Sequence, residues 1–163
     1  YRSIGRLLID RGRVPKEEMS MQRLRRYLME NPAEREEIFG YNESYVFFRV
    51  LENGPLGSLE VPVTGGRSMA TDARLFPKGA LAWIQTQIPM IDGNGKLAGW
   101  RPIGRFVLNQ DTGGAIRGLQ RADLYFGSGE EPGGLAGYMN RPGRIFFLML
   151  KQDPSPTRRL GGG

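Results

Sequence analysis

The chain has 163 residues, enough for one domain with a core, and its 24 Gly and 11 Pro favour turns and short strands over a helical bundle. Because it contains neither Cys nor His, disulfides, thiol catalysis and Ser-His dyads are excluded, and an enzyme without a cofactor would move protons with Asp, Glu, Lys or Tyr. The net charge of +6 suits an anionic polymer, but no dense Lys/Arg run flanked by aromatic residues indicates nucleic acid, and the longest apolar runs are too short to span a bilayer.

The first 40 residues are predicted to be mostly helical. Ser3 and Ser20 are good N-caps, each placed before a segment with apolar residues on one helical face. The four residues 31–34, Asn-Pro-Ala-Glu, match a capping box that opens a short helix ending at Gly40. We therefore expect helices over 4–11, 21–30 and 32–40.

From Tyr45 onward the pattern favours β structure. Short apolar or β-branched runs are bounded by Gly, Pro or Asn clusters. They predict strands over 45–51, 66–70, 80–86, 103–109, 122–126 and 144–150. About six short strands without a long helix between them suggest a small closed barrel. The residues after Lys151 are expected to be disordered.

Asp111 is the first candidate for chemistry. It follows the apolar run Arg105-Phe106-Val107-Leu108 and precedes Thr112-Gly113-Gly114. An acid at a strand end, followed by two glycines, places a carboxylate beside backbone that a bulky ligand can approach closely. The alternative is an Asp that hydrogen-bonds its own turn, as Asp-x-Gly sequences often do.

Asp123 is the second candidate. It alternates with Ala122 and Leu124, so it would lie on the opposite face of a strand from them. The alternative is an ordinary solvent-facing Asp. If two neighbouring strands bring Asp111 and Asp123 close, mutual repulsion would raise the pKa of one carboxyl toward a proton-donating value. General acid catalysis without histidine needs such an arrangement.

Two further patterns have simpler explanations. Asp72 precedes a Pro-Lys-Gly turn and is best explained as a turn or capping residue, with a supporting role near the site still possible. The triplet Asp111-Thr112-Gly113 is also the one aspartic proteases use, but such a protease needs two copies and this chain has one. The glycines at 113, 114 and 118 are not a P-loop, because no Lys-Ser/Thr pair follows them.

Taken together, these stretches resemble the C-terminal half of the membrane-bound lytic murein transglycosylase A (MltA) family. The joint order of the matching segments is highly specific, whereas no single segment is. The three acids Asp72, Asp111 and Asp123 match the trio that names the related three-aspartate (3D) domain. The matching segments are 1–10, 18–22, 42–48, 66–72, 111–118 and 122–125.

The resemblance implies a mainly β fold, a double-psi β-barrel preceded by a short helical segment. It divides the chain into a helical segment at 1–44 from an inserted second domain, a barrel at 45–151 and a disordered tail at 152–163. The family's N-terminal region supplies a barrel strand and most of the second domain, so we expect a partial barrel. It also implies a monomer in the periplasm, associated with the outer membrane through an upstream anchor.

The activity implied is cleavage of the β-1,4 bond between N-acetylmuramic acid and N-acetylglucosamine in peptidoglycan, giving 1,6-anhydromuramoyl ends without hydrolytic water. One carboxylic acid suffices, because the sugar's own 6-hydroxyl is the nucleophile. No metal or cofactor is expected, and the glycan strand is the partner. The rival interpretation is a non-catalytic peptidoglycan-binding barrel.

Within the family the acid/base residue falls on Asp123, and Asp111 matches the neighbouring aspartate, which would raise the pKa of Asp123 and orient sugar hydroxyls. The backbone of Gly113, Gly114 and Ala115 would line the cleft. Ser20 and Gln22 are expected to touch the glycan.

Overall fold

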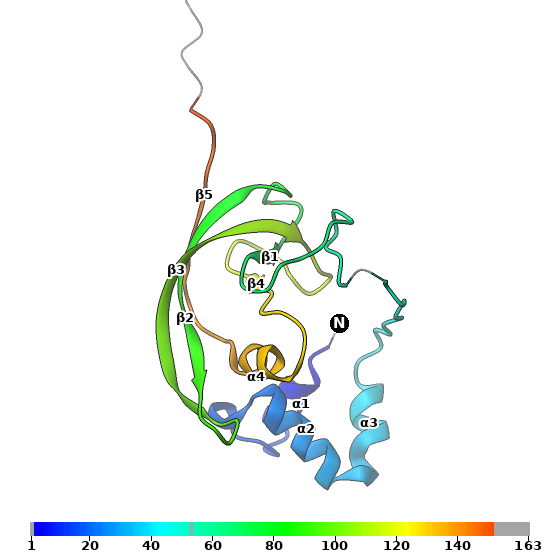
Figure 1. Ribbon diagram of the computed structural model, residues 1–163. Coiled ribbons are helices and arrows are strands. Elements are labelled where there is room, and N and C mark those ends of the chain that lie inside the picture. Colours follow the sequence, from blue (N-terminus) through cyan, green and yellow to red (C-terminus); the bar gives the residue numbers. More distant parts are fainter. Residues whose placement is uncertain (1, 53, 152–163) are drawn as a thin grey trace, which may run out of the picture.

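The computed structural model describes residues 2–52 and 54–151 and shows a curled sheet with helices gathered at one end (Figure 1). The α-helices are α1 (Ile4–Asp10), α2 (Met21–Glu30), α3 (Arg35–Gly40) and α4 (Glu130–Tyr138), with 3-10 turns η1 (Lys16–Glu18) and η2 (Pro32–Glu34). The strands are β1 (Ser68–Thr71), β2 (Leu81–Ile91), β3 (Leu97–Asp111), β4 (Ala122–Leu124) and β5 (Arg144–Phe147). Within the described ranges no helix is long and apolar enough to cross a membrane.

The two predicted serine caps are confirmed. The Ser3 hydroxyl accepts a hydrogen bond from the backbone N–H of Arg6 at 3.3 Å, and the Ser20 hydroxyl accepts one from Arg23 at 3.1 Å. Each cap satisfies a backbone donor that has no partner inside the helix. Local side-chain chemistry therefore sets the starts of α1 and α2.

The predicted capping box is wrong, although the helix does end at Gly40. Asn31 makes no capping bond. Its amide donates instead to the Tyr27 carbonyl at 2.9 Å, while the Glu34 carboxylate accepts from the Tyr27 hydroxyl at 2.8 Å. Both polar side chains therefore bond back to α2, and the segment begins as the turn η2 before α3.

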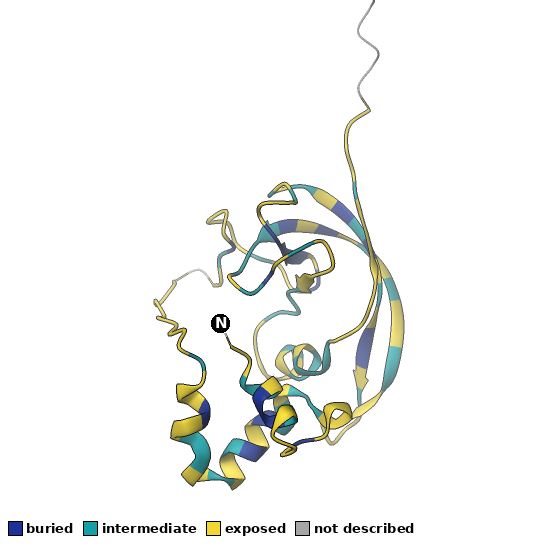
Figure 2. Ribbon diagram, turned by 180° about the vertical axis from the view of Figure 1, so that it is seen from behind, coloured by how far each residue is buried: buried dark blue, intermediate teal, exposed yellow. Residues whose placement is uncertain are grey.

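The helices bury a core of their own. The buried side chains are Leu8, Val14, Leu24, Tyr27 and Ile38, all from the first 40 residues. Four of them lie in α1, α2 and α3, while Val14 lies between α1 and η1. In Figure 2, dark blue buried stretches alternate with yellow exposed ones along these helices. Burying such apolar surface is the main favourable term in folding, so this cluster holds the helical segment together.

The sheet has five strands in the order β4-β1-β3-β2-β5. The pair β1·β3 is parallel, and the other pairs are antiparallel. β2 and β3 form a long hairpin whose turn is held by Asp92, whose carboxylate accepts from the backbone N–H groups of Asn94 and Lys96 at 2.9 Å each. Met69, Ala82, Ile84 and Val107 form the core beneath β1, β2 and β3.

The barrel expected from the strand count is not closed in the described part of the chain. The sheet ends at β4 and β5, which do not pair with each other. Its strands also differ in length from those predicted, because β2 and β3 extend beyond 80–86 and 103–109 while β4 and β5 are shorter than expected. The result is a half-barrel whose concave side faces α4 (Figure 1).

One predicted strand is wrong, and one helix was missed. The segment 45–51 is extended and exposed but has no ladder partner among the described residues, so it is not a strand. Conversely, α4 was not predicted, because Pro132, Gly133 and Gly134 disfavour a helix. Its contacts with β2 and α2 supply the packing that the local sequence lacks. The predicted disorder of 152–163 lies outside the described residues.

Candidate active site

Asp111 and Asp123 lie on either side of Ala70. β1 runs between β3 and β4, and Ala70 is in register with Asp111 on one side and with Asp123 on the other. Residues in register across a sheet project from the same face, and two strand spacings separate these Cα atoms by about 10 Å. The arrangement considered from the sequence, with the two acids on directly neighbouring strands, is not the one observed, because β1 separates their strands.

A β-bulge sets this register. Along the β1·β3 ladder Met69 pairs with Asn109, whereas Ala70 pairs with Asp111, so Gln110 is the extra residue. A one-residue change of register moves a side chain to the opposite face of a sheet. The bulge thus determines the face on which the last residue of β3 projects.

Asp72 directly follows β1 and is fully buried, with a side-chain exposure of 0%. The guanidinium of Arg74 donates to both of its oxygens, at 3.0 and 2.7 Å, and the backbone N–H of Gly118 donates at 2.9 Å. Arg117 lies 3.8 Å from the same carboxylate. The Arg74 hydrogen bonds, followed by the backbone N–H groups of Gly118 and Arg74, hold the pKa of Asp72 well below its usual range.

Asp72 is therefore a structural anion and not a proton donor. Its carboxylate also accepts from the backbone N–H of Arg74 at 3.1 Å, which is the turn geometry predicted from its sequence context. The bond from Gly118 ties the end of β1 to the glycine-rich segment after β3. Asp72 therefore holds the turn after β1 against the segment that carries Gly118, and its supporting role at the site stays a prediction.

Asp111 ends β3 and is half-buried. Its carboxylate accepts a hydrogen bond from the backbone N–H of Ser58 at 2.9 Å, and the Ser58 hydroxyl donates to the Gln110 carbonyl at 3.4 Å. The loop around Gly57 lies directly on this strand end, because a Cβ on Gly57 would come within 2.5 Å of the Gln110 carbonyl oxygen. The absence of a side chain at Gly57 permits this approach.

Asp123 is half exposed, and its carboxylate is held by Arg121. The Nε and Nη2 atoms of Arg121 each donate to one carboxylate oxygen at 3.0 Å, in the paired geometry typical of Arg and carboxylates. The Nη1 atom of Arg121 donates to the Ala115 carbonyl at 2.8 Å. One guanidinium therefore joins the candidate acid to the loop of glycines that precedes it.

The loop after Asp111 is anchored by one buried side chain. Ile116 is 7% exposed, and its N–H donates to the Gly113 carbonyl at 3.0 Å, which closes a turn. A Cβ added at Gly114 would meet nothing within 4 Å, so this backbone is open to a ligand. Gly118 has φ +83°, in the left-handed region that glycine adopts without strain.

Ser20 directly precedes α2, and Gln22 lies in its first turn. The Ser20 hydroxyl caps α2, and the Gln22 amide donates to the Gly134 carbonyl in α4 at 3.0 Å. The structure thus brings together Asp72, Asp111, Asp123 and the loop 113–118. It places Gln22 at the contact between α2 and α4, and Ser20 at the cap of α2.

Several residues of the site were not singled out from the sequence. Arg74 and Arg121 each lie two positions from the acid that they bond. Since this i, i+2 spacing is visible in the chain, the Arg121-Asp123 pair could have been predicted. Nothing in the sequence around Lys78 indicated that its ammonium contacts β1 and β3. Gly118 was noted in the matching segment 111–118 and in a failed P-loop pattern, but its bond to Asp72 was not foreseen.

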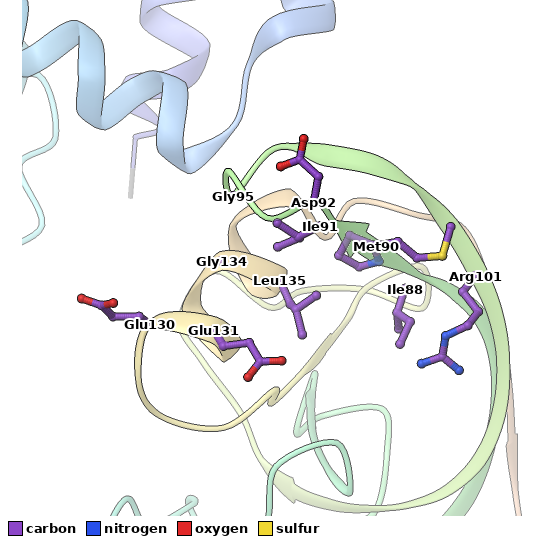
Figure 3. Close-up of a pocket in the computed structure, with 11 residues that line it drawn as sticks. Ile88, Met90, Ile91, Asp92, Gly95, Arg101, Glu130, Glu131, Gly134 and Leu135 are labelled. Carbon is purple, nitrogen blue, oxygen red and sulfur yellow. The ribbon is translucent and has the colours of Figure 1, made fainter.

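A separate concavity lies between β2, β3 and α4 (Figure 3). It has a volume of about 620 Å³, and the three aspartates are not among its lining residues. Its walls are mixed, with the apolar chains of Ile88 and Leu135 beside the charges of Arg101, Glu130 and Glu131. The candidate acids therefore lie outside this pocket. In 2–52 and 54–151 no group of three acidic side chains is positioned to hold a metal ion.

Two family models match the chain, the MltA specific insert domain over residues 1–49 and the 3D domain over residues 67–149. The membrane-bound lytic murein transglycosylase A of Escherichia coli strain K12 is 41% identical over 150 residues, covering 91% of this chain and 40% of the relative. That of Vibrio cholerae is 33% identical, covering 95% of this chain and 42% of the relative. The chain thus spans about two fifths of the length of these relatives.

Solved structures show the same likeness. The crystal structure of E. coli MltA with bound chitohexaose has a TM-score of 0.73 at 38% identity, covering 90% of this chain and 44% of that one. The membrane-bound lytic murein transglycosylase of Agrobacterium tumefaciens also has a TM-score of 0.73, at 37% identity, covering 90% of this chain and 40% of that one. These matches confirm the predicted mainly β fold, a partial double-psi β-barrel with a helical segment.

Proposed function

Since this chain belongs to the membrane-bound lytic murein transglycosylase A family, we propose that it carries the catalytic barrel of a lytic transglycosylase. The substrate is the glycan strand of peptidoglycan, cut at the β-1,4 bond between N-acetylmuramic acid and N-acetylglucosamine. The product ends in 1,6-anhydro-N-acetylmuramic acid. The single observation that carries the proposal is that Asp111 and Asp123 flank Ala70 on one face of the sheet.

Asp123 is the acid and then the base. Its carboxylic acid gives a proton to the glycosidic oxygen, which leaves as the 4-hydroxyl of N-acetylglucosamine. The 6-hydroxyl of the muramic acid attacks its own anomeric carbon, and the Asp123 carboxylate accepts the proton from that hydroxyl. One bond to the anomeric carbon breaks and one forms, the proton returns to Asp123, and no water is consumed.

Arg121 sets a condition on the first step. A guanidinium only donates hydrogen bonds, and Arg121 donates to both oxygens of Asp123. The acid form must direct its proton at the sugar, so Arg121 has to release at least one oxygen when substrate binds. The backbone around Ala115, which Arg121 also contacts, offers a polar surface beside the scissile bond.

Asp111 supports Asp123 from the other side of Ala70. Its half-buried carboxylate is oriented by the Ser58 N–H, and it lies on the same face as the acid. We assign it the role of holding sugar hydroxyls near the open Gly113-Gly114 backbone. Asp72 keeps the loop carrying Gly118 in place as a carboxylate.

The remaining assignments follow from the same proposal. Residues 1–44 form the end of an inserted second domain and 45–151 the barrel, in a monomer that acts on glycan in the periplasm. Association with the outer membrane would come from a part of the protein outside this sequence.

Neither a metal nor a cofactor is required for the chemistry, because one carboxyl moves both protons. Ser20 and Gln22 would reach the glycan only from the helical side.

The test is digestion of purified murein by the protein at its full natural length and by its Asp123→Asn variant, with mass spectrometry of the products. We expect anhydro-ended muropeptides from the wild type and a loss of about a hundredfold to ten-thousandfold in the variant. Absence of these products from the wild type, or equal amounts from the variant, would sink the catalytic proposal. A protein that sediments with insoluble murein but releases nothing would be a peptidoglycan-binding barrel.

A further inference from the structure

Lys78 joins the ends of two parallel strands. Its ammonium donates to the Thr71 carbonyl at the end of β1, at 3.0 Å, and to the Asp111 carbonyl at the end of β3, at 2.6 Å. It also donates to the Thr71 hydroxyl at 3.0 Å and to the Asn109 side-chain oxygen at 3.1 Å. Of the residues that supply these acceptors, Thr71 directly precedes Asp72, and Asp111 is itself a candidate site residue.

The partners of Lys78 are themselves buried and fixed. Thr71 and Asn109 are both 0% exposed, and the Thr71 hydroxyl lies 2.9 Å from the Asn109 oxygen. The Asn109 amide donates to the Pro77 carbonyl at 2.8 Å, while the Gly79 N–H donates to the Asn109 carbonyl at 2.8 Å. The turn that carries Lys78 is therefore attached to β3 on both sides of the lysine.

The ammonium has three N–H donors for four acceptors, so its hydrogen-bonding capacity is fully used. It has no donor to spare for a sugar, which argues against direct contact with the substrate. Burial lowers the pKa of Lys78, and the charges of Asp111 and Asp72 act in the opposite direction. The cation is thus held by the backbone and side-chain oxygens of β1 and β3, including the backbone carbonyl of Asp111.

We propose that Lys78 is a positioning residue that fixes Asp111 beside the acid by clamping the last residue of β3 to the end of β1. The inference rests on the proposed function, because it assigns Asp111 a part in that reaction. Asp111 projects from a strand end directly after a bulge, where the ladder alone restrains it weakly. The 2.6 Å bond from Lys78 to its carbonyl supplies the missing restraint.

The experiment replaces Lys78 by Met, which keeps the length of the chain and removes every donor. The matched control is Lys96→Met, at an exposed lysine in the turn between β2 and β3. Both variants are made in the protein at its full natural length and assayed on soluble, uncrosslinked murein glycan strands. Thermal unfolding is recorded for each, and the assays are run well below the lowest midpoint.

We expect kcat to fall by about tenfold to a hundredfold in Lys78→Met, with KM changed less than about threefold, because a misplaced group costs catalysis more than binding. Lys96→Met should match the wild type. In an Asp111→Asn background the loss caused by Lys78→Met should largely disappear, since coupled residues are not additive. A purely structural lysine would lower activity equally in both backgrounds, and that result would overturn the proposal.

A second measurement separates this inference from the proposed function. If the wild type gives no anhydro-ended product, the catalytic proposal fails, and the affinity of each protein for chitohexaose is measured by calorimetry. Weaker binding by Lys78→Met than by Lys96→Met would still support the positioning of a glycan-binding Asp111. Equal affinities would overturn it.

Discussion

Arg121, which directly precedes β4, and Asp123 on β4 form a two-pronged ion pair, with both hydrogen bonds at 3.0 Å. Both side chains are about half exposed, at 48% and 47%, so the pair can open without breaking the core. Exposed ion pairs of this kind contribute little to stability, typically below about 1 kcal/mol. The pair is therefore better understood as a resting arrangement of the site than as a source of stability.

The first prediction concerns this pair in a complex with glycan. A crystal structure with bound chitohexaose should show Arg121 withdrawn from at least one Asp123 oxygen, because the acid must face the glycosidic oxygen. The freed donors should contact the ligand or the Ala115 carbonyl. If both 3.0 Å bonds persist around an ordered sugar at the cleavage position, Asp123 is not the proton donor.

The second prediction concerns Asp111. Asp111→Asn keeps an oxygen that can accept from the Ser58 N–H, so the fold and the midpoint of unfolding should be preserved. The charge is lost, and kcat on murein should fall by about tenfold to a hundredfold, less than for Asp123→Asn. Anhydro-product release and thermal unfolding measured on the same samples check this. Full activity in Asp111→Asn would remove it from the mechanism.

The third prediction concerns acid stability. The pKa of Asp72 is lower in the folded protein than its ordinary value of about 4. Its contribution to stability is therefore complete above about pH 4 and is lost as the pH falls from there through the folded pKa. Thermal midpoints between pH 6 and pH 2 should fall less steeply in Asp72→Asn than in the wild type. Parallel curves would show that Asp72 does not govern this dependence.

The fourth prediction tests the cap of α2. Ser20→Ala removes the acceptor for the Arg23 N–H and should lower the free energy of unfolding by about 1 kcal/mol. The control is Ser44→Ala, since the contacts of Ser44 with Asn42 are made by its backbone. Denaturant unfolding of both variants gives the comparison. A loss no greater than that of Ser44→Ala would contradict the capping role.

The sequence correctly predicted several contacts between residues close together in the chain, although the capping box at 31–34 was wrong. Ser3 and Ser20 each cap a helix three residues before the bonded N–H, and this spacing is visible in the chain. Asp72 likewise bonds within its own turn. Such contacts close over a few residues, so composition and spacing determine them.

Long-range order was harder to foresee. The resemblance identified Asp111 and Asp123, but nothing local reveals that β1, from earlier in the chain, inserts between their strands. Lys78 was missed for the same reason, since Asn109 and Asp111 are more than 30 residues away. The apolar run at 45–51 matched a strand pattern, yet a strand also needs a partner.

The position of β1 also has a consequence for the order of folding. The hairpin of β2 and β3 closes over a short turn, whereas β1 must dock in parallel on β3 across the whole hairpin, and β4 can add only to β1. Joining distant segments costs more chain entropy and is slower than closing a hairpin. We therefore expect a refolding chain to form the hairpin first, and its acids to come together only in the last step.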